Sequence, residues 1–384
     1  MIEGRSWLGW GSRVAIFLVL AAVAAVFQID RHSNTRPTLM VYVPPGIGGF
    51  ADAKIGRLLA MPAPQLALER TEASLRHRPI DAGTLAAFAM AAVEADDPDR
   101  AGRALGYAAS RGWRDTYTQI MVIGSAISEE NWIIAAQRID ALTRLQREKE
   151  AIFASLSMML PSAHGREALA ARLEGSNTLM FALADFLGAY PNFSAEVADT
   201  LITARERAPQ MPCARFARVT RTLLARNRGA LAIAVWPEGC MGSEGRGLAF
   251  TPSLGENYPF SWIYPPSPGV VVRQVDTSGV LIVQNRDRLR HPFATRYTVL
   301  EPGERRLTLQ KDEQSDARLG AYPRAGDLHI ELRCDRSSKS RYSALVSQVY
   351  SEPIAFKVPA DCPTQFLTLS ISSGSAKNLS ISID

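Results

Sequence analysis

The chain of 384 residues is longer than one typical core and suits two domains of about 100–200 residues each. Its hydrophobic content of 47% and charged content of 21% are ordinary for a folded protein. The net charge of +5 comes from 43 basic and 38 acidic residues spread along the chain. This composition argues against a dedicated nucleic-acid binder, for which a clustered basic stripe is expected.

The first predicted element is an uncharged, largely apolar run of sixteen residues at 14–29. A bilayer crossing needs about 20 apolar residues and a secretory signal core about 7–15, so the run lies between the two. Arg5 and Arg13 precede it, and the small residues at 22–24 offer a cleavage site. We expect residues 1–30 to be a retained membrane anchor or a cleaved signal, and either one delivers the remaining chain across a membrane.

Residues 31–50 are expected to form a tether. A short strand is expected at 38–43, and the Pro-Pro-Gly sequence that follows ends it. Gly46 and Gly48 lack the third glycine of a dinucleotide-binding fingerprint, and no Gly-Lys-Ser/Thr follows them. We therefore interpret these glycines as a flexible joint.

The pattern from 51 to 228 is helical, with regular stop signals. Asp81 is expected to be the N-cap of one helix, whose apolar stripe is Leu85, Phe88, Ala89 and Ala92. The sequence Asp96-Asp97-Pro98 ends that helix and starts the next, which ends at Gly112.

Apolar positions in this region repeat every 34 residues. The stripe of Ala101, Leu105 and Ala108 returns at Ala135, Ile139 and Leu142, and more faintly at Leu169 and Leu173. The region resembles the tetratricopeptide-repeat family, in which stacked helical hairpins bury faces that one hairpin cannot bury alone. The alternative is a non-repetitive helical bundle.

From 229 to 384 the sequence is typical of strands. Short runs rich in Val, Ile, Thr and Tyr are bounded by turn residues, and no helical pattern separates them. The expected strands are 269–275, 280–284, 296–300, 305–310, 328–334, 346–358 with a bend at Pro353, 365–371 and 379–383. Pro302-Gly303 is expected to be a tight turn between two of them. The pattern predicts a β-sandwich of the jelly-roll type.

The four cysteines suggest two local disulfides. Their order favours Cys213 with Cys240 and Cys334 with Cys362 among three possible connectivities, and four free thiols are the alternative. We expect the second bridge to link the two sheets. No Cys-x-x-Cys occurs and no histidine lies close to a cysteine, so neither a metal site nor any other cofactor is expected.

No catalytic motif is present in the sequence. Gly242-Ser-Glu-Gly245 is one residue short of a nucleophile elbow, and His329 is expected to face outward from a sheet. Asp327 and Glu331 are candidate carboxylates for glycoside hydrolysis only in the sense that any acidic residue on a sheet would be. We therefore expect no enzymatic activity.

Four aromatic residues alternate along one segment. If it is extended, Tyr258, Phe260, Trp262 and Tyr264 lie on one side, where flat rings can hold a sugar. We take Trp262, Tyr264 and Tyr258 as candidate carbohydrate contacts, with core packing as the alternative, and expect Phe260 to be core. Polar contacts could come from Arg273, Gln274 and Asn285.

The whole chain resembles a group of bacterial envelope proteins that accompany exopolysaccharide or capsule assembly. They combine one membrane segment, degenerate helical repeats and a β-domain similar to carbohydrate-binding modules. The matching positions are Phe260, Trp262, Pro302, Gly303, Leu332, Cys334, Val358, Pro359, Cys362, Gln365, Phe366 and Leu367.

This resemblance implies a non-enzymatic, membrane-tethered periplasmic adaptor. We expect a single-pass inner-membrane protein whose helical domain (51–228) binds an envelope protein and whose sandwich (229–384) contacts polysaccharide. The expected partners are the membrane, that envelope protein and polysaccharide. Nucleic acid is not expected as a partner. The alternatives are a glycan-active hydrolase or lyase with dispersed carboxylates and a structural envelope protein without a ligand.

Overall fold

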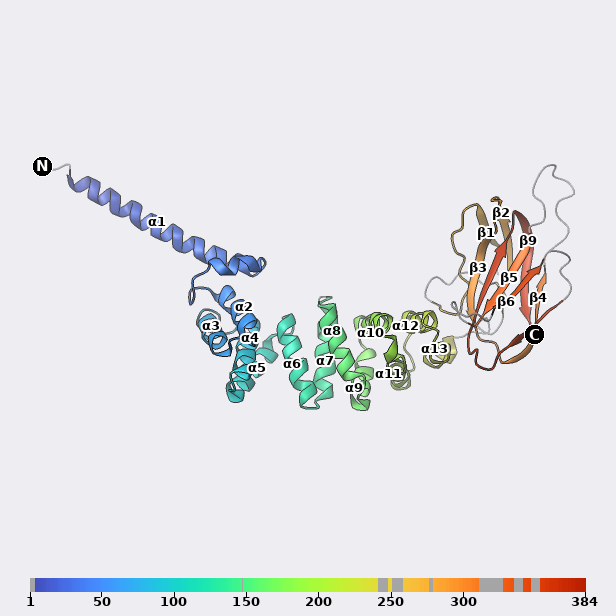
Figure 1. Cartoon of the computed structure of the whole chain (residues 1–384), viewed down its shortest axis with the longest axis horizontal. Helices are drawn as coiled ribbons and strands as arrows, with labels where there is room; N and C mark the ends of the chain where they lie inside the picture. Colours follow the sequence, from blue (N-terminus) through green and yellow to red (C-terminus); the bar gives the residue numbers. More distant parts are fainter. Residues whose placement is uncertain are drawn as a thin grey trace. The chain divides into compact units, whose positions relative to one another are not determined.

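The computed structural model describes residues 4–146, 148–240, 248–250, 258–275, 279–310, 327–334, 341–346 and 353–384. The chain forms two compact units, Met1–Met159 and Leu160–Asp384. Helices make up the first unit, whereas the second contains helices followed by antiparallel strands (Figure 1).

The first unit begins with one long helix, α1 (Gly4–Ser33). Its stretch Trp10–Ser33 is long and apolar enough to cross a membrane, and its most apolar 18 residues have a mean hydropathy of 2.2 and are not buried. The strand expected at 38–43 is wrong, because the chain forms a 3₁₀ helix there, η1 (Pro37–Tyr42). The fixed φ of a proline at the start of this helix suits a helical turn.

The end of α1 holds the start of α2 (Gly49–Leu59). The buried carboxylate of Asp30 accepts hydrogen bonds of 2.8–3.3 Å from the backbone N–H groups of residues 49–51. Gly48, the N-cap position of α2, has no side chain to serve these donors, and a Cβ there would lie 2.7 Å from Asp30 Oδ1. Gly48 therefore allows a close approach, and the interpretation of this glycine as part of a flexible joint is wrong.

Helices α2 to α8 of the first unit stack as pairs. Within pairs α2 contacts α3, α4 contacts α5 and α6 contacts α7, and between pairs α2 contacts α4, α4 contacts α6 and α6 contacts α8. The bounds are α3 (Pro64–His77), α4 (Ala82–Glu94), α5 (Pro98–Arg111), α6 (Thr116–Ser128), α7 (Trp132–Arg144) and α8 (Lys149–Met159).

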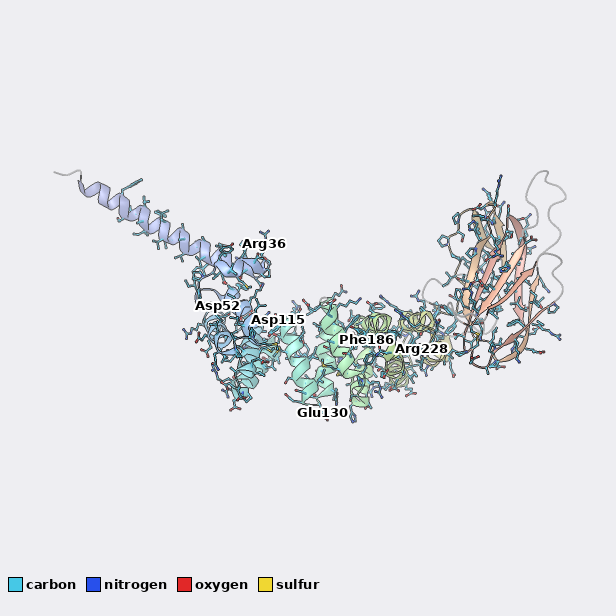
Figure 2. The ribbon with its side chains drawn as sticks, viewed as in Figure 1. Arg36, Asp52, Asp115, Glu130, Phe186 and Arg228 are labelled. Atoms are coloured by element: carbon cyan, nitrogen blue, oxygen red, sulfur yellow. A yellow bond between two sulfur atoms is a disulfide. The ribbon has the colours of Figure 1, made fainter. Side chains whose placement is uncertain are left out.

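Side-chain caps set most of these helix starts. Asp81 accepts a hydrogen bond from the backbone N–H of Thr84, which confirms the expected N-cap of α4. Asp97, Asp115 (Figure 2) and Asn131 do the same for α5, α6 and α7. Each cap satisfies a donor that the helix itself leaves unpaired. The local sequence therefore determines where the helices begin.

The repeated apolar positions are buried in the helical stack. Ala101 is 4% exposed, and Ala135 and Leu169 are fully buried. The 34-residue period holds for two successive pairs, since α6 begins 34 residues after α4 and α7 begins 34 after α5. It then shortens, because α9 begins 31 residues after α7.

Five α-helices open the described part of the second unit: α9 (Ala163–Leu173), α10 (Asn177–Ala189), α11 (Ser194–Arg207), α12 (Cys213–Ala225) and α13 (Gly229–Val235). Two 3₁₀ helices accompany them, η2 (Pro191–Phe193) and η3 (Glu238–Cys240). Alternate helices contact one another, α9 with α11, α10 with α12 and α11 with α13. Helix α13 extends past residue 228, where we expected the strand-forming region to begin.

Nine described strands form two antiparallel sheets that share one apolar core, which is the arrangement of a β-sandwich. One sheet has the order β1-β2-β9-β4-β7 and the other β3-β8-β5-β6. The bounds are β1 (Val270–Val275), β2 (Val280–Asn285), β3 (His291–Thr298), β4 (Gly303–Gln310), β5 (Leu328–Arg333), β6 (Arg341–Val346), β7 (Ile354–Val358), β8 (Gln365–Ile371) and β9 (Gly374–Ile383).

The alternation expected in these strands is confirmed. Leu328, Ile330 and Leu332 are buried on one face of β5, and residues 367, 369 and 371 are buried on one face of β8. The turn at Pro302-Gly303 connects β3 to β4, which belong to different sheets. Gly303 has a φ of +127°, a conformation that favours glycine.

Two strand predictions need correction. Strand β6 (Arg341–Val346) was not expected, and the strand predicted at 346–358 corresponds instead to the end of β6 and to β7, with residues 347–352 outside the described part of the chain. The strand expected at 296–300 begins earlier, at His291. Pro292 lies within β3 next to a register irregularity in its pairing with β8, so it did not prevent a strand.

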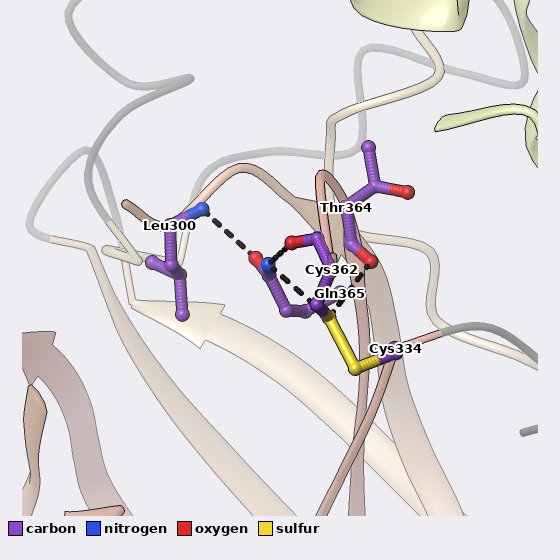
Figure 3. Close-up of a disulfide and its surroundings, with 5 residues drawn as sticks. All are labelled: Leu300, Cys334, Cys362, Thr364 and Gln365. Atoms are coloured by element: carbon purple, nitrogen blue, oxygen red, sulfur yellow. Dashed lines mark hydrogen bonds between the residues drawn. A yellow bond between two sulfur atoms is a disulfide. The ribbon is translucent and has the colours of Figure 1, made fainter. Parts of the chain in front are cut away.

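Both expected disulfides are present, Cys213 with Cys240 and Cys334 with Cys362. The expectation that the second links the two sheets is wrong, because Cys334 follows β5 and Cys362 precedes β8, which are neighbours in one sheet. Figure 3 shows how this bridge is fixed: the buried Gln365 side chain accepts a hydrogen bond from the Leu300 N–H and donates one to the Cys362 carbonyl.

We predict that Asp30→Ala loosens the first turn of α2. Loss of an N-terminal cap costs about 0.5–2 kcal/mol, so the amides of residues 49–51 should exchange hydrogen about tenfold faster. Hydrogen exchange of the full chain in detergent micelles, read by mass spectrometry, measures this. Asp99→Ala is the control, since Asp99 lies exposed in the first turn of α5. Equal exchange in both variants would contradict the capping role.

We also predict that replacing Cys213 and Cys240 together by alanine destabilises the second unit. The bridge spans 27 residues, and closing a loop of that length contributes about 3–4 kcal/mol in the chain-entropy model. Urea unfolding of the full chain in detergent should show a lower midpoint for the double variant. An unchanged midpoint, with the other bridge intact, would show that this disulfide does not hold the fold.

Candidate functional site

The main candidate site is a cleft of about 760 Å³ in the second unit, a size typical of small-molecule sites. It is formed by α11, α13 and the segment after it, the β3–β4 connection and the end of β9. Its lining residues are Ile202, Arg205, Ile233, Ala234, Trp236, Glu238, Val299, Leu300, Glu301, Arg305, Ile383 and Asp384.

Trp236 lies in the wall of the cleft. It is 2% exposed and contacts the rings of Tyr258 and Phe260 edge to face, with centroids 6.1 and 6.2 Å apart. Such pairs stabilise one another beyond the area they bury. Tyr258 and Phe260, two of the four aromatic residues of the segment 258–264, therefore pack against Trp236 in the cleft wall. Trp236 itself was not among the residues expected to form a site.

Two constraints position Trp236 and its neighbours. The Cys213–Cys240 bridge ties η3 to the first residue of α12. At the other end of α13, a Cβ on Gly229 would lie 2.1 Å from Thr364 Oγ1, so α13 approaches the β7–β8 connection as closely as only glycine allows. The Thr364 side chain therefore packs directly against the backbone at the start of α13.

The two arginines of the cleft donate hydrogen bonds to neighbouring protein groups. Arg205 donates to the carbonyls of Ala234 and Trp236 at 2.8 and 3.4 Å. Arg305 donates to the backbone carbonyl and the carboxylate of Glu301, both at 3.1 Å. Apolar walls with a few polar donors and acceptors suit a ligand that carries both kinds of surface, such as a sugar.

The structure does not place Trp262 on a sugar-binding surface. Trp262 is fully buried, its Nε1 donates to the carbonyls of residues 248 and 249 at 3.1 and 3.0 Å, and its ring lies 4.9 Å from that of Phe250. It is a core residue, so the expectation that Trp262 contacts carbohydrate is wrong. The alternative weighed at the outset, core packing, holds for this position.

The other two aromatic candidates are half-buried. The Ser261 N–H donates to the Tyr258 carbonyl at 3.1 Å, so this segment turns and its four rings do not share one side as an extended chain would place them. Tyr264 packs against the sandwich core. Burial raises the pKa of the Tyr264 phenol, and the guanidinium of Arg296 opposes this shift.

The polar residues proposed as sugar contacts lie apart from the cleft lining. Asn285 is 2% exposed and donates to the carbonyls of Leu289 and Ile371, which is a structural role. Gln274 donates to the Phe250 carbonyl at 3.3 Å, and Arg273 is exposed on β1.

His329 and Glu331 lie on β5, and Asp327 directly precedes it. His329 alternates with buried residues as expected, but it is half-buried rather than solvated. Burial and the Arg290 guanidinium lower the pKa of His329, and the Glu331 carboxylate opposes the shift. Glu331 pairs with Arg333 at 2.7 Å, and Asp327 is exposed. The segment 242–245 lies outside the described residues.

Within the described ranges, no cluster of histidine, cysteine, aspartate and glutamate side chains could hold a metal ion. No protein-family model matches the chain, and no curated protein matches it either.

We predict that Trp262→Ala acts on stability. Removing a fully buried tryptophan costs about 3–5 kcal/mol, so the urea midpoint of the full chain in detergent should fall markedly. Ile263→Ala is the control, because the adjacent Ile263 is 40% exposed and should change stability little. If both variants unfold at the wild-type midpoint, Trp262 does not anchor the core.

Proposed function

We propose that the protein is a non-enzymatic, membrane-anchored adaptor of the bacterial envelope, with its bulk in the periplasm. The observation that carries this proposal is α1, an exposed apolar helix long enough to span a bilayer that continues directly into the residues capping the helical stack. The two disulfides support an oxidising compartment, in which such bridges persist.

The helical pairs serve in this proposal as a tetratricopeptide-like array that binds an envelope protein. Support comes from the stacking of successive pairs and from the small buried residues where paired helices meet, such as Ala101 and Ala135. Exposed apolar side chains along the array, including Ile133 and Phe181, offer contact area to a partner.

The strand-rich domain serves as a jelly roll that contacts exopolysaccharide during its assembly or export. The order β2-β9-β4-β7 in one sheet and β3-β8-β5-β6 in the other supports a jelly roll, because β2 to β9 then form two four-stranded antiparallel sheets around one core. We assign the polysaccharide contact to the cleft beside Trp236, since the predicted contact at Trp262 is buried.

The binding test uses the full chain in detergent and total extracellular polysaccharide from the producing cells. Arg305→Ala should weaken binding about tenfold, because hydrogen bonds to charged groups contribute about 1.5–3 kcal/mol. Arg288→Ala, an exposed arginine of the same domain, is the matched control and should bind as the wild type does. Binding can be followed by biolayer interferometry.

Two outcomes of this experiment favour the other candidate functions. Three acidic residues, Glu238, Glu301 and Asp384, line the cleft, and release of soluble fragments from the polysaccharide would favour a glycan-active enzyme. The Glu301 side chain is 89% exposed, however, and lacks the desolvated setting of a general acid. No binding by the wild-type chain would favour a structural envelope protein.

A further inference from the structure

The juxtamembrane surface of the first unit carries exposed apolar and basic side chains together. In η1, Val41 and Tyr42 are 70% and 69% exposed although both are largely apolar. Arg31 in the last turn of α1 and Arg36 directly before η1 are also exposed. Aromatic, aliphatic and basic side chains are the combination that lies at the interface of a bilayer.

The level of the bilayer on α1 follows from helix geometry. From Trp10 to Ile29 the helix rises about 28 Å at about 1.5 Å per residue, which matches a hydrocarbon core of about 30 Å. Arg13 lies within a turn of Trp10, close enough to that end for its long side chain to reach the headgroups. Asp30 is the first charged residue after that stretch. If α1 spans the membrane, Asp30 lies at the boundary between the acyl chains and the headgroups.

The same geometry brings η1 to that boundary. A Cβ on Gly48 would lie 2.7 Å from Asp30 Oδ1 and also 2.7 Å from Val43 Cγ1, so these two side chains meet around Gly48. Tyr42 is bonded to Val43, and consecutive Cα atoms lie only 3.8 Å apart. Tyr42 is therefore the neighbour of Val43, which lies beside Asp30 at the level of the headgroups.

The connection between α1 and the helical stack is held by several bonds. Besides the three amides held by Asp30, Lys54 Nζ donates to the carbonyls of Ser33 and Asn34 at 2.7 and 2.5 Å. The Arg78 guanidinium lies over the Phe50 ring at 3.7 Å. The Asp30 and Lys54 bonds hold α2 against the end of α1, and η1 contacts both helices, so the exposed face of η1 keeps its level relative to the span.

We propose that η1 lies in the headgroup layer of the bilayer, with Val41 and Tyr42 inserted at the interface and Arg31 and Arg36 facing anionic lipid. This inference rests on the proposed anchoring of α1. The occupant of this surface is the membrane itself, because the surface is continuous with the helix that spans it. The first helix pair of the array then stands at a fixed height on the membrane.

The test places the photoreactive residue p-benzoylphenylalanine at one position of the full chain at a time. The protein is reconstituted in nanodiscs of phosphatidylcholine and phosphatidylglycerol, irradiated, and analysed for lipid adducts by mass spectrometry. The probe replaces Tyr42, Tyr107 or Leu18 in separate samples. Tyr107 is the matched control, since it is a tyrosine 61% exposed on α5, and α5 contacts α4 and α6 instead of α1. Leu18 reports on α1 itself.

We expect lipid adducts at positions 18 and 42, with a yield at 42 several-fold above that at 107. Adducts at 18 with none above the control at 42 would overturn the inference and leave the anchor in place. No adducts at either 18 or 42 would overturn the anchor and the inference together. Adducts from 42 to a second copy of the chain would show that protein, instead of lipid, covers η1.

Discussion

The structure of the first unit depends on a carboxylate supplied by one helix to the start of another. Asp30 is buried at the end of α1, and its oxygens hold the first three amides of α2. A buried carboxylate is costly unless its hydrogen-bonding capacity is used, and here the three amides use it. Because Gly48 leaves room for this contact, polar bonds join the apolar helix to the helical stack, and the bonds from Lys54 to the Ser33 and Asn34 carbonyls add to them.

In the second unit, the last helix and the strands are held together by a close backbone contact and a disulfide. Gly229 allows α13 to reach Thr364, and the Cys213–Cys240 bridge returns the chain to α12 just after Trp236. The cleft is a consequence of this arrangement: its walls come from helices and from strand ends that are far apart in the sequence. A site of this kind keeps its shape only while both constraints hold, which makes the oxidation state of the chain part of the site.

Local signals in the sequence predicted much of the fold and little of the site. Asp81, Asp97 and the alternation in β5 and β8 act within a few residues, so they are legible in the sequence. The pairing of Asp30 with α2 and of Gly229 with Thr364 spans longer separations and leaves no periodic pattern. The error at Trp262 has the same origin: the spacing of the aromatic residues did not indicate the turn at 258–261 or the distant contacts that bury the Trp262 ring. Trp236 could have been noticed only as a tryptophan followed by proline at the end of an apolar helix.

The excess of basic residues acquires a meaning only in the folded chain. Two arginines donate to carbonyls at the C-terminal ends of other helices, Arg138 to Ala109 and Arg215 to Glu174, and Arg57 donates to the Gly83 carbonyl near the start of α4. A helix leaves its last four carbonyls without partners, and a guanidinium from the next pair supplies donors and favourable charge there. Arg138 is buried for this purpose beneath Trp113, and burial lowers its pKa. These cations are engaged within the helices, whereas Arg31 in α1 and Arg36 after it stay exposed. Part of the positive charge of the chain therefore serves contacts between helices, and part remains at the surface.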